Sequence, residues 1–181
     1  MIKHIVPLFF IVLLSACGSS VDSENNMDLS STDTIFEYDE NQEKLSAVEF
    51  NNELTTMQNG MLNQIDLLFQ SDSSDVDINL ENAIFEASLN LDKLAALSNQ
   101  EGGMEFVAAM SALMEFYRDE LSDNFGEVKE ILKKSTFSDE NDQFLKEYDL
   151  SFAKEEERLF QQVFEAQEQF ANENSIKLET L

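Results

Sequence analysis

The sequence predicts an all-α fold, an antiparallel four-helix bundle whose helices run up, down, up and down. Beyond Pro7 the chain has no proline, and few glycines interrupt residues 44–181, so long helices are favoured. Within the same range, four stretches repeat apolar residues every three or four positions, which is the spacing of one helix face. Short connections between long helices are typical of an antiparallel bundle.

The first seventeen residues have the three parts of a secretory leader. Lys3 supplies an early positive charge, residues 5–14 form an apolar run, and small residues follow. The apolar run is about ten residues long, whereas a helix that spans a bilayer needs roughly 20. We therefore expect a leader rather than a membrane span. The alternative reading is an ordinary signal peptide that ends near a lone cysteine.

The segment Leu14-Ser15-Ala16-Cys17 closes this leader and resembles the lipobox of bacterial lipoproteins. The resemblance implies a signal peptide over residues 1–16, cleavage before Cys17 and acylation of that cysteine. Two or more acyl chains give stable membrane anchoring. Gly18 stands where an Asp commonly retains such proteins in the inner membrane, so we expect the outer membrane, with either the periplasmic or the outer surface as the location.

Residues 17–43 are expected to be a disordered acidic tether. From Gly18 onward the segment holds many acids, serines and asparagines and no Lys or Arg, a composition that cannot offset the entropy of ordering. A flexible spacer of this length holds the body about 25–30 Å from the membrane. In the alternative, Ile35, Phe36 and Tyr38 dock on the body as a short lead-in.

The helical body is expected over residues 44–178. Its first helix spans about 44–70, and a loop rich in capping residues follows at 71–75. The second helix ends near Ser98, before the clearest break in the chain, Gly102-Gly103.

The third apolar stripe runs from Phe106 to Leu132 and contains Gly126, where a bend can form. A turn follows, and Ser138 is the expected N-cap of the fourth helix. Acids directly after Ser138 favour the positive end of the helix dipole. We expect this last helix to stop near residues 172–174.

Charge and residue types exclude several classes of function. The chain has 37 Asp and Glu against 11 Lys and Arg, a surface that repels nucleic acid. The single histidine, His4, lies in the leader, so the mature chain has no His-based catalytic pair and no His-containing metal or haem site. Cys17 is the only cysteine, so no internal disulfide forms. We predict no enzyme activity and no cofactor.

One segment has the oxygen spacing of a calcium-binding EF-hand loop. The candidate ligands are Asp75, Asp77, Asn79, Glu81 and Glu86. Leu80 occupies the position where the loop needs a glycine for its sharp turn, and apolar residues alternate with the ligands. We therefore expect a capped, acid-rich start of the second helix, with a weak divalent-cation site as the alternative.

Other polar groups lie on or beside the apolar stripes. Asn51, Asn52, Gln58 and Gln167 are expected to form hydrogen bonds between helices and fix their register, with a polar ligand pocket as the alternative. We expect Glu155-Glu156-Glu157 to be a solvated surface.

Two further groups are assigned to packing and to the surface. Met57, Met61, Met110 and Met114 are expected to be adaptable core packing. Phe116-Tyr117 is expected at the core or its boundary, with Arg118 in a surface ion pair.

Three fragments resemble a family of small helical surface lipoproteins of unknown function from spirochaetes and Bacteroidetes. They are Val48-Glu49-Phe50-Asn51-Asn52 with Gln58, Phe116-Tyr117, and Ala166-Gln167-x-x-Phe170-Ala171-x-x-Asn174-x-Ile176. The resemblance covers most of residues 45–178. It implies a surface or periplasmic helical lipoprotein and brings no catalytic residues.

The sequence thus predicts a lipid-anchored, non-enzymatic helical bundle of the cell envelope that acts as an interaction or binding module. Its membrane contact is the N-terminal lipid, and its partner is an unknown envelope protein or small ligand, with no nucleic acid. The alternatives are a small-ligand carrier with a pocket between the helices and a weak divalent-cation binder.

Overall fold

Every regular element in residues 45–134 and 136–178, which the computed structural model describes, is a helix. The all-α prediction is therefore confirmed for this part of the chain. Residues 45–177 form one compact unit. The predicted signal peptide, Cys17 and the tether lie outside the described residues.

Helix α1 spans Ala47–Phe69 and begins at a reciprocal cap. The backbone N–H of Ser46 donates to Oε2 of Glu49 at 2.9 Å, and the backbone N–H of Glu49 donates to Oγ of Ser46 at 3.3 Å. Two N–H groups that have no partner inside the helix are satisfied in this way. The helix occupies most of the predicted range.

Helices α2 (Val76–Leu97) and α3 (Met104–Asp119) follow, as the apolar stripes predict. Asp72 organises the turn before α2 by accepting from the backbone N–H of Ser74 at 2.8 Å. Gly102 has a φ of +71°, a left-handed conformation that glycine adopts at little cost. The predicted break at Gly102-Gly103 is therefore confirmed.

Helix α3 continues into a π-helical segment, η1 (Glu120–Asn124), and then into α4 (Phe125–Leu132). The sequence predicted one helix with a bend at Gly126, whereas the irregular turn lies just before that residue. Tyr117, Leu121 and Phe125 are all buried at successive spacings of four. An α-helix has about 3.6 residues per turn, so side chains spaced four apart move gradually around the helix axis. The wider π turn compensates for this shift and keeps the three side chains on the core side.

Helix α5 (Asp139–Glu173) begins at the predicted cap, since Oγ of Ser138 accepts from the backbone N–H of Asn141 at 3.2 Å. Acids occupy its first turn, next to the positive end of the helix dipole. It ends at Asn174, which agrees with the predicted stop.

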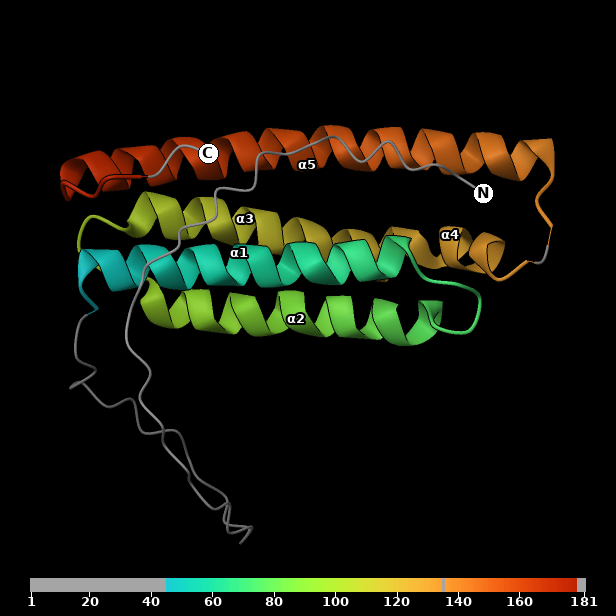
Figure 1. The fold of residues 1–181 in the computed structure, drawn as a ribbon, viewed down its shortest axis with the longest axis horizontal. Helices are drawn as coiled ribbons and strands as arrows, with labels where there is room; N and C mark the ends of the chain where they lie inside the picture. Colours follow the sequence, from blue (N-terminus) through green and yellow to red (C-terminus); the bar gives the residue numbers. More distant parts are fainter. Residues whose placement is uncertain (1–44, 135, 179–181) are drawn as a thin grey trace, which may run out of the picture. The chain divides into compact units, whose positions relative to one another are not determined.

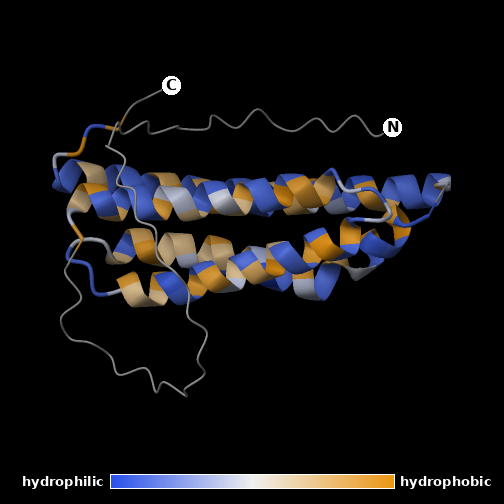
Figure 2. Ribbon diagram, turned by 60° about the horizontal axis from the view of Figure 1, so that its bottom comes forward, coloured by the Kyte–Doolittle hydropathy of each residue, from blue (hydrophilic) through white to orange (hydrophobic). Residues whose placement is uncertain are grey.

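The helices lie side by side (Figure 1), and hydrophilic and hydrophobic residues alternate along each of them (Figure 2). Helix α2 contacts α1 and α3, and α3 contacts α5. Aromatic rings join α1 to α5: Phe50 and Phe170 have centroids 4.9 Å apart, and Phe69 and Phe152 are 5.4 Å apart. Among the described helices, none is both long enough and apolar enough to cross a bilayer.

Candidate functional site

The five candidate calcium ligands do not form a loop. Asp75 is the N-cap residue of α2, and Asp77, Asn79, Glu81 and Glu86 lie within that helix. Helical backbone puts residues 77 and 81 on one side of α2 and residue 79 on another, whereas an EF-hand loop turns all three toward one ion. The described residues contain no group of three or more acidic, His or Cys side chains placed to hold a metal.

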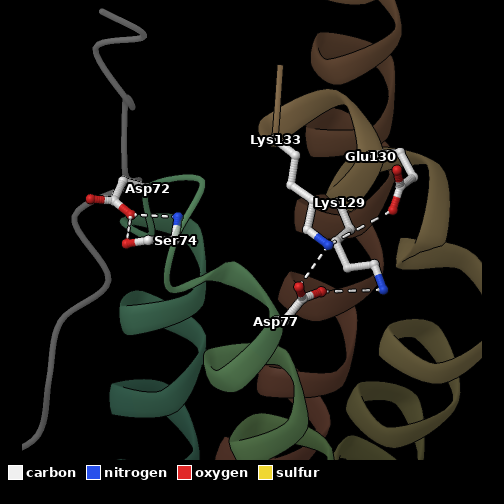
Figure 3. A network of polar contacts seen from close by, with 6 residues as sticks. All are labelled: Asp72, Ser74, Asp77, Lys129, Glu130 and Lys133. Carbon is white, nitrogen blue, oxygen red and sulfur yellow. Dashed lines mark hydrogen bonds and ion pairs between the residues drawn. The ribbon is translucent and has the colours of Figure 1, made fainter. Parts of the chain in front are cut away.

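Asp77 and Asn79 have other partners. The carboxylate of Asp77 lies 2.6 Å from Nζ of Lys133 and 3.4 Å from Nζ of Lys129, at the end of α4 (Figure 3). These ion pairs lower the pKa of Asp77, with the hydrogen bond to Lys133 as the largest cause. Asn79 donates to Oγ of Ser71 at 2.8 Å. Both side chains thus tie the start of α2 to neighbouring segments.

The most unusual polar contact joins Tyr117 of α3 to Glu156 of α5. The hydroxyl of Tyr117, which is fully buried, donates to Oε1 of Glu156 at 2.6 Å. Burial raises the pKa of Glu156, the hydrogen bond from Tyr117 partly opposes that shift, and the charges of Asp66 and Asp149 add to it. Burial likewise raises the pKa of Tyr117 well above its ordinary value.

The solvated surface predicted for Glu155-Glu156-Glu157 is therefore wrong at its middle residue. Glu156 follows Phe152 by four positions and precedes Leu159 by three, so it shares their core-facing side of α5. Glu155 remains on the surface and accepts from Nε of Arg158 at 3.0 Å. Glu157 is exposed, as predicted.

A second phenol and carboxyl group lie near each other between α5 and η1, and here the phenol is on α5. Tyr148 of α5 lies near Glu120, the first residue of η1, and burial first, then the charge of Glu120, raises the pKa of Tyr148. The hydroxyl of Tyr148 is buried and makes no hydrogen bond of good geometry among the described residues. Glu120 instead accepts from Nδ2 of Asn124 at 2.7 Å.

Phe152 lies between these two pairs. Its ring centroid is 6.1 Å from that of Tyr117 and 6.1 Å from that of Tyr148, and Phe116 packs on it at 5.1 Å. The prediction that Phe116 and Tyr117 are core or boundary residues is confirmed. Arg118 makes the predicted surface ion pair, 2.7 Å from Asp119.

A separate amide network joins α1 to α5. Nε2 of Gln167 donates to Oδ1 of Asn51 at 3.0 Å and lies 3.3 Å from Oγ1 of Thr55. Asn51 and Gln167 are both buried. The prediction of an interhelical hydrogen bond is confirmed for this pair, whereas Asn52 and Gln58 are only partly buried and contribute no bond to it.

Asn90 is a buried polar residue that the sequence reasoning missed. Its Nδ2 makes only long contacts, 3.5 Å to the carbonyl oxygen of Met57 and 3.8 Å to Sδ of Met114. Its Oδ1 is buried with no hydrogen-bond partner among the described residues. The signal was present, because Asn90 falls between Ala87 and Leu94 on the apolar stripe of α2.

Chemically, the Tyr117–Glu156 pair is a place where the fold can hold a proton on a carboxyl group. A carboxyl whose pKa is raised binds its proton at higher pH than an exposed one.

No known family, curated protein or solved structure matches the chain.

Proposed function

We propose that the chain is a bacterial lipoprotein whose helical body acts at the cell envelope as a non-enzymatic interaction module. The observation that carries the proposal is the segment Leu14-Ser15-Ala16-Cys17 at the end of a short apolar leader. In this proposal residues 1–16 are removed, Cys17 is acylated, and residues 17–43 hold the body away from the outer membrane.

The body fits the finer architecture of an antiparallel up-down-up-down four-helix bundle. Residues 70–75, 98–103 and 133–138 are short connections between helices that lie side by side. Connections of this length join antiparallel neighbours in bundles. In this arrangement the segment from α3 to α4 counts as one long helix with a π-helical turn inside it.

Acylation is tested by metabolic labelling with an alkyne-bearing fatty acid in a bacterial host. The chain should take up the label and fractionate with membranes, and Cys17→Ser should lose both properties, because only the thiol of Cys17 can receive the lipid. Mass spectrometry of the mature N-terminus should find a lipid-modified Cys17. An unlabelled chain, or a mature N-terminus elsewhere, would refute the proposal.

A small-ligand carrier is the second candidate, and Asn90 is the observation that favours it. A buried amide oxygen without a partner costs free energy that a polar ligand or an ordered water would recover. Native mass spectrometry of the chain purified from its own cells distinguishes the two functions. A mass larger than that of the polypeptide, lost on denaturation, would show a bound ligand and support the carrier. A mass equal to that of the polypeptide would favour the interaction module.

A further inference from the structure

Helix α2 carries large apolar side chains on the side that faces away from the core as well as on the side that forms it. Its core side carries Leu80, Ala83, Ala87 and Leu94 among others. On the opposite side, Ile78 is 52% exposed and Phe85 is 68% exposed. Residues seven positions apart lie on the same line along a helix. Two large apolar side chains therefore point outward together.

The same line continues along the helix. Leu89 is half-buried and Ala96 is exposed, so the four residues Ile78, Phe85, Leu89 and Ala96 are spaced by seven, four and seven. With Asn82 and Asp92 in the gaps, these four residues follow the spacing with which one helix packs on another. We call these four residues the α2 seam. No described segment buries Ile78 or Phe85.

The outward side of α5 provides a contrast. Leu150 is 70% exposed there, but no large apolar residue lies four or seven positions from it, whereas Phe85 has Ile78 and Leu89 at those spacings. A single exposed leucine on a polar face is ordinary for a surface helix. Aligned apolar side chains on an outward face instead indicate a contact surface.

Charge indicates what covers the seam. Glu81 lies one turn before Phe85 and Asp92 two turns after it; both are exposed, and neither makes an ion pair with a described residue. Helix α2 has one basic residue, Lys93, against the four acids Asp77, Glu81, Glu86 and Asp92. The whole chain has 37 acidic and 11 basic residues. A second copy would bring the same acids against these, whereas a basic partner would neutralise them.

We propose that the α2 seam docks a basic amphipathic helix from another envelope protein. Apolar side chains of the partner pack between Ile78 and Phe85, and its Lys or Arg side chains lie over Glu81 and Asp92. This inference rests on the proposed role as an interaction module and names the surface and the chemistry of its partner. Helix-on-helix recognition of this kind uses apolar anchors at helical spacing with charges beside them.

The probe is a synthetic helical peptide of leucines and lysines with all leucines on one face. Its control is a peptide of the same composition in scrambled order. The protein is the chain without residues 1–16 and with Cys17→Ser, because the compact unit and its apolar core lie within residues 45–177. Fluorescence anisotropy measures the dissociation constant for each peptide.

The double variant Ile78→Ser/Phe85→Ser should weaken binding of the amphipathic peptide at least tenfold, because both anchors are lost. Leu150→Ser, which removes an equally exposed leucine from a charged face, should bind as the unaltered chain does. Ile78 and Phe85 are both exposed, so circular dichroism of the double variant should show the helix content of the unaltered chain. Glu81→Lys/Asp92→Lys should lower affinity for the lysine peptide and raise it for a matched glutamate peptide.

Three results would overturn the proposal. Equal binding of the scrambled peptide would mean that surface charge alone attracts the probe. Equal loss in Leu150→Ser and in the α2 double variant would mean that the seam is not the site. A dimer that the α2 double variant abolishes would identify a second copy as the occupant. None of these results affects acylation of Cys17, so the lipoprotein proposal stands or falls separately.

Discussion

The hydroxyl of Tyr117 donates a 2.6 Å hydrogen bond to Oε1 of Glu156 and joins α3 to α5, while the rings of Phe116 and Phe152 pack beside the phenol. The phenol is fully buried and Glu156 is half-buried, so the hydrogen bond forms at a place with little access to water. In such surroundings a polar group that loses its partner is costly, whereas a satisfied pair contributes a modest net stabilisation.

Removing the two buried phenol hydroxyls should have opposite effects. Tyr117→Phe leaves Glu156 without its donor and should lower the free energy of unfolding by about 1–3 kcal/mol. Tyr148→Phe removes a buried hydroxyl that makes no hydrogen bond of good geometry, and it should be neutral or slightly stabilising. Urea denaturation of the two variants, each compared with the unaltered chain, measures the difference. Equal destabilisation by both would show that Tyr148 has a partner that matters.

Stability should depend on pH through Glu156. Its pKa is raised in the folded chain above the ordinary value near 4.5, so the folded state binds the proton more tightly than the unfolded state does. The resulting stabilisation is present below about pH 4.5 and is lost as the pH rises through the raised folded value. Glu156→Gln keeps an acceptor for Tyr117 without the charge. It should therefore be more stable than the unaltered chain at pH 7, and this advantage should be smaller at pH 4, where Glu156 is protonated.

Glu157→Gln is the control for this experiment, because Glu157 is exposed on the neighbouring position of α5. It removes one carboxyl group from the surface of the same helix and so measures, at each pH, the effect of one acid fewer. The quantity to compare is the difference in melting temperature between each variant and the unaltered chain, because the titration of the remaining acids affects both chains alike. A Glu156→Gln difference that does not change with pH would contradict the assignment.

Asn51 and Gln167 should be strongly coupled. Gln167→Leu leaves the buried amide oxygen of Asn51 without its donor and should cost about 1–3 kcal/mol of stability. Asn51→Leu should cost less, because Nε2 of Gln167 keeps its 3.3 Å contact with Oγ1 of Thr55. Replacing both removes the whole polar pair, so the double variant should be more stable than the sum of the single effects predicts. A double-mutant cycle in urea measures this coupling, and additive effects would mean that the 3.0 Å contact contributes nothing.

Asn90→Leu tests the opposite case within the same core. Its amide has only long contacts and its oxygen has no described partner, so an apolar residue of similar size should be neutral or stabilising. Destabilisation by about 1 kcal/mol or more would indicate that an ordered water or ligand satisfies Asn90 in solution. Together, the Asn51–Gln167 and Asn90 experiments separate a satisfied buried amide from an unsatisfied one.

The sequence predicted the helices and their caps because local signals determine them. Apolar periodicity located α1, α2 and α5, Ser138 marked a helix start, and Gly102-Gly103 marked a break. The π-helical turn could not be predicted in the same way, because it depends on keeping Tyr117, Leu121 and Phe125 against the same core. That requirement becomes visible only once the neighbouring helices are in place.

The polar contacts were less predictable than the helices. Asn51 and Gln167 were correctly expected to bond across helices, since both lie on apolar stripes. Glu156 was misassigned because it lies in a run of three acids, which is typical of a solvated surface. Its spacing from Phe152 and Leu159, which places it on their side of α5, was given too little weight. Which phenol it would meet depends on the alignment of α3 with α5, and the sequence alone does not specify that alignment.

Two glycines should respond in opposite ways to alanine. A Cβ at position 103 would lie 2.6 Å from Cζ and 2.9 Å from Cε1 of Phe50. Phe50 is fully buried and packs against Phe106 and Phe170, so its ring has no room to move away. Gly103→Ala should therefore overpack the core and destabilise the fold by about 1–3 kcal/mol.

Gly126→Ala is the matched control and should stabilise the fold. The position lies in α4, and a Cβ there would have no neighbour within 4 Å. Alanine restricts the unfolded chain and favours the helix, a gain of about 0.4–1 kcal/mol. Urea denaturation of the two variants measures both effects. A stabilised Gly103→Ala would mean that the 102–103 turn can move away from Phe50, whereas a destabilised Gly126→Ala would mean that the turn after η1 needs the freedom of glycine.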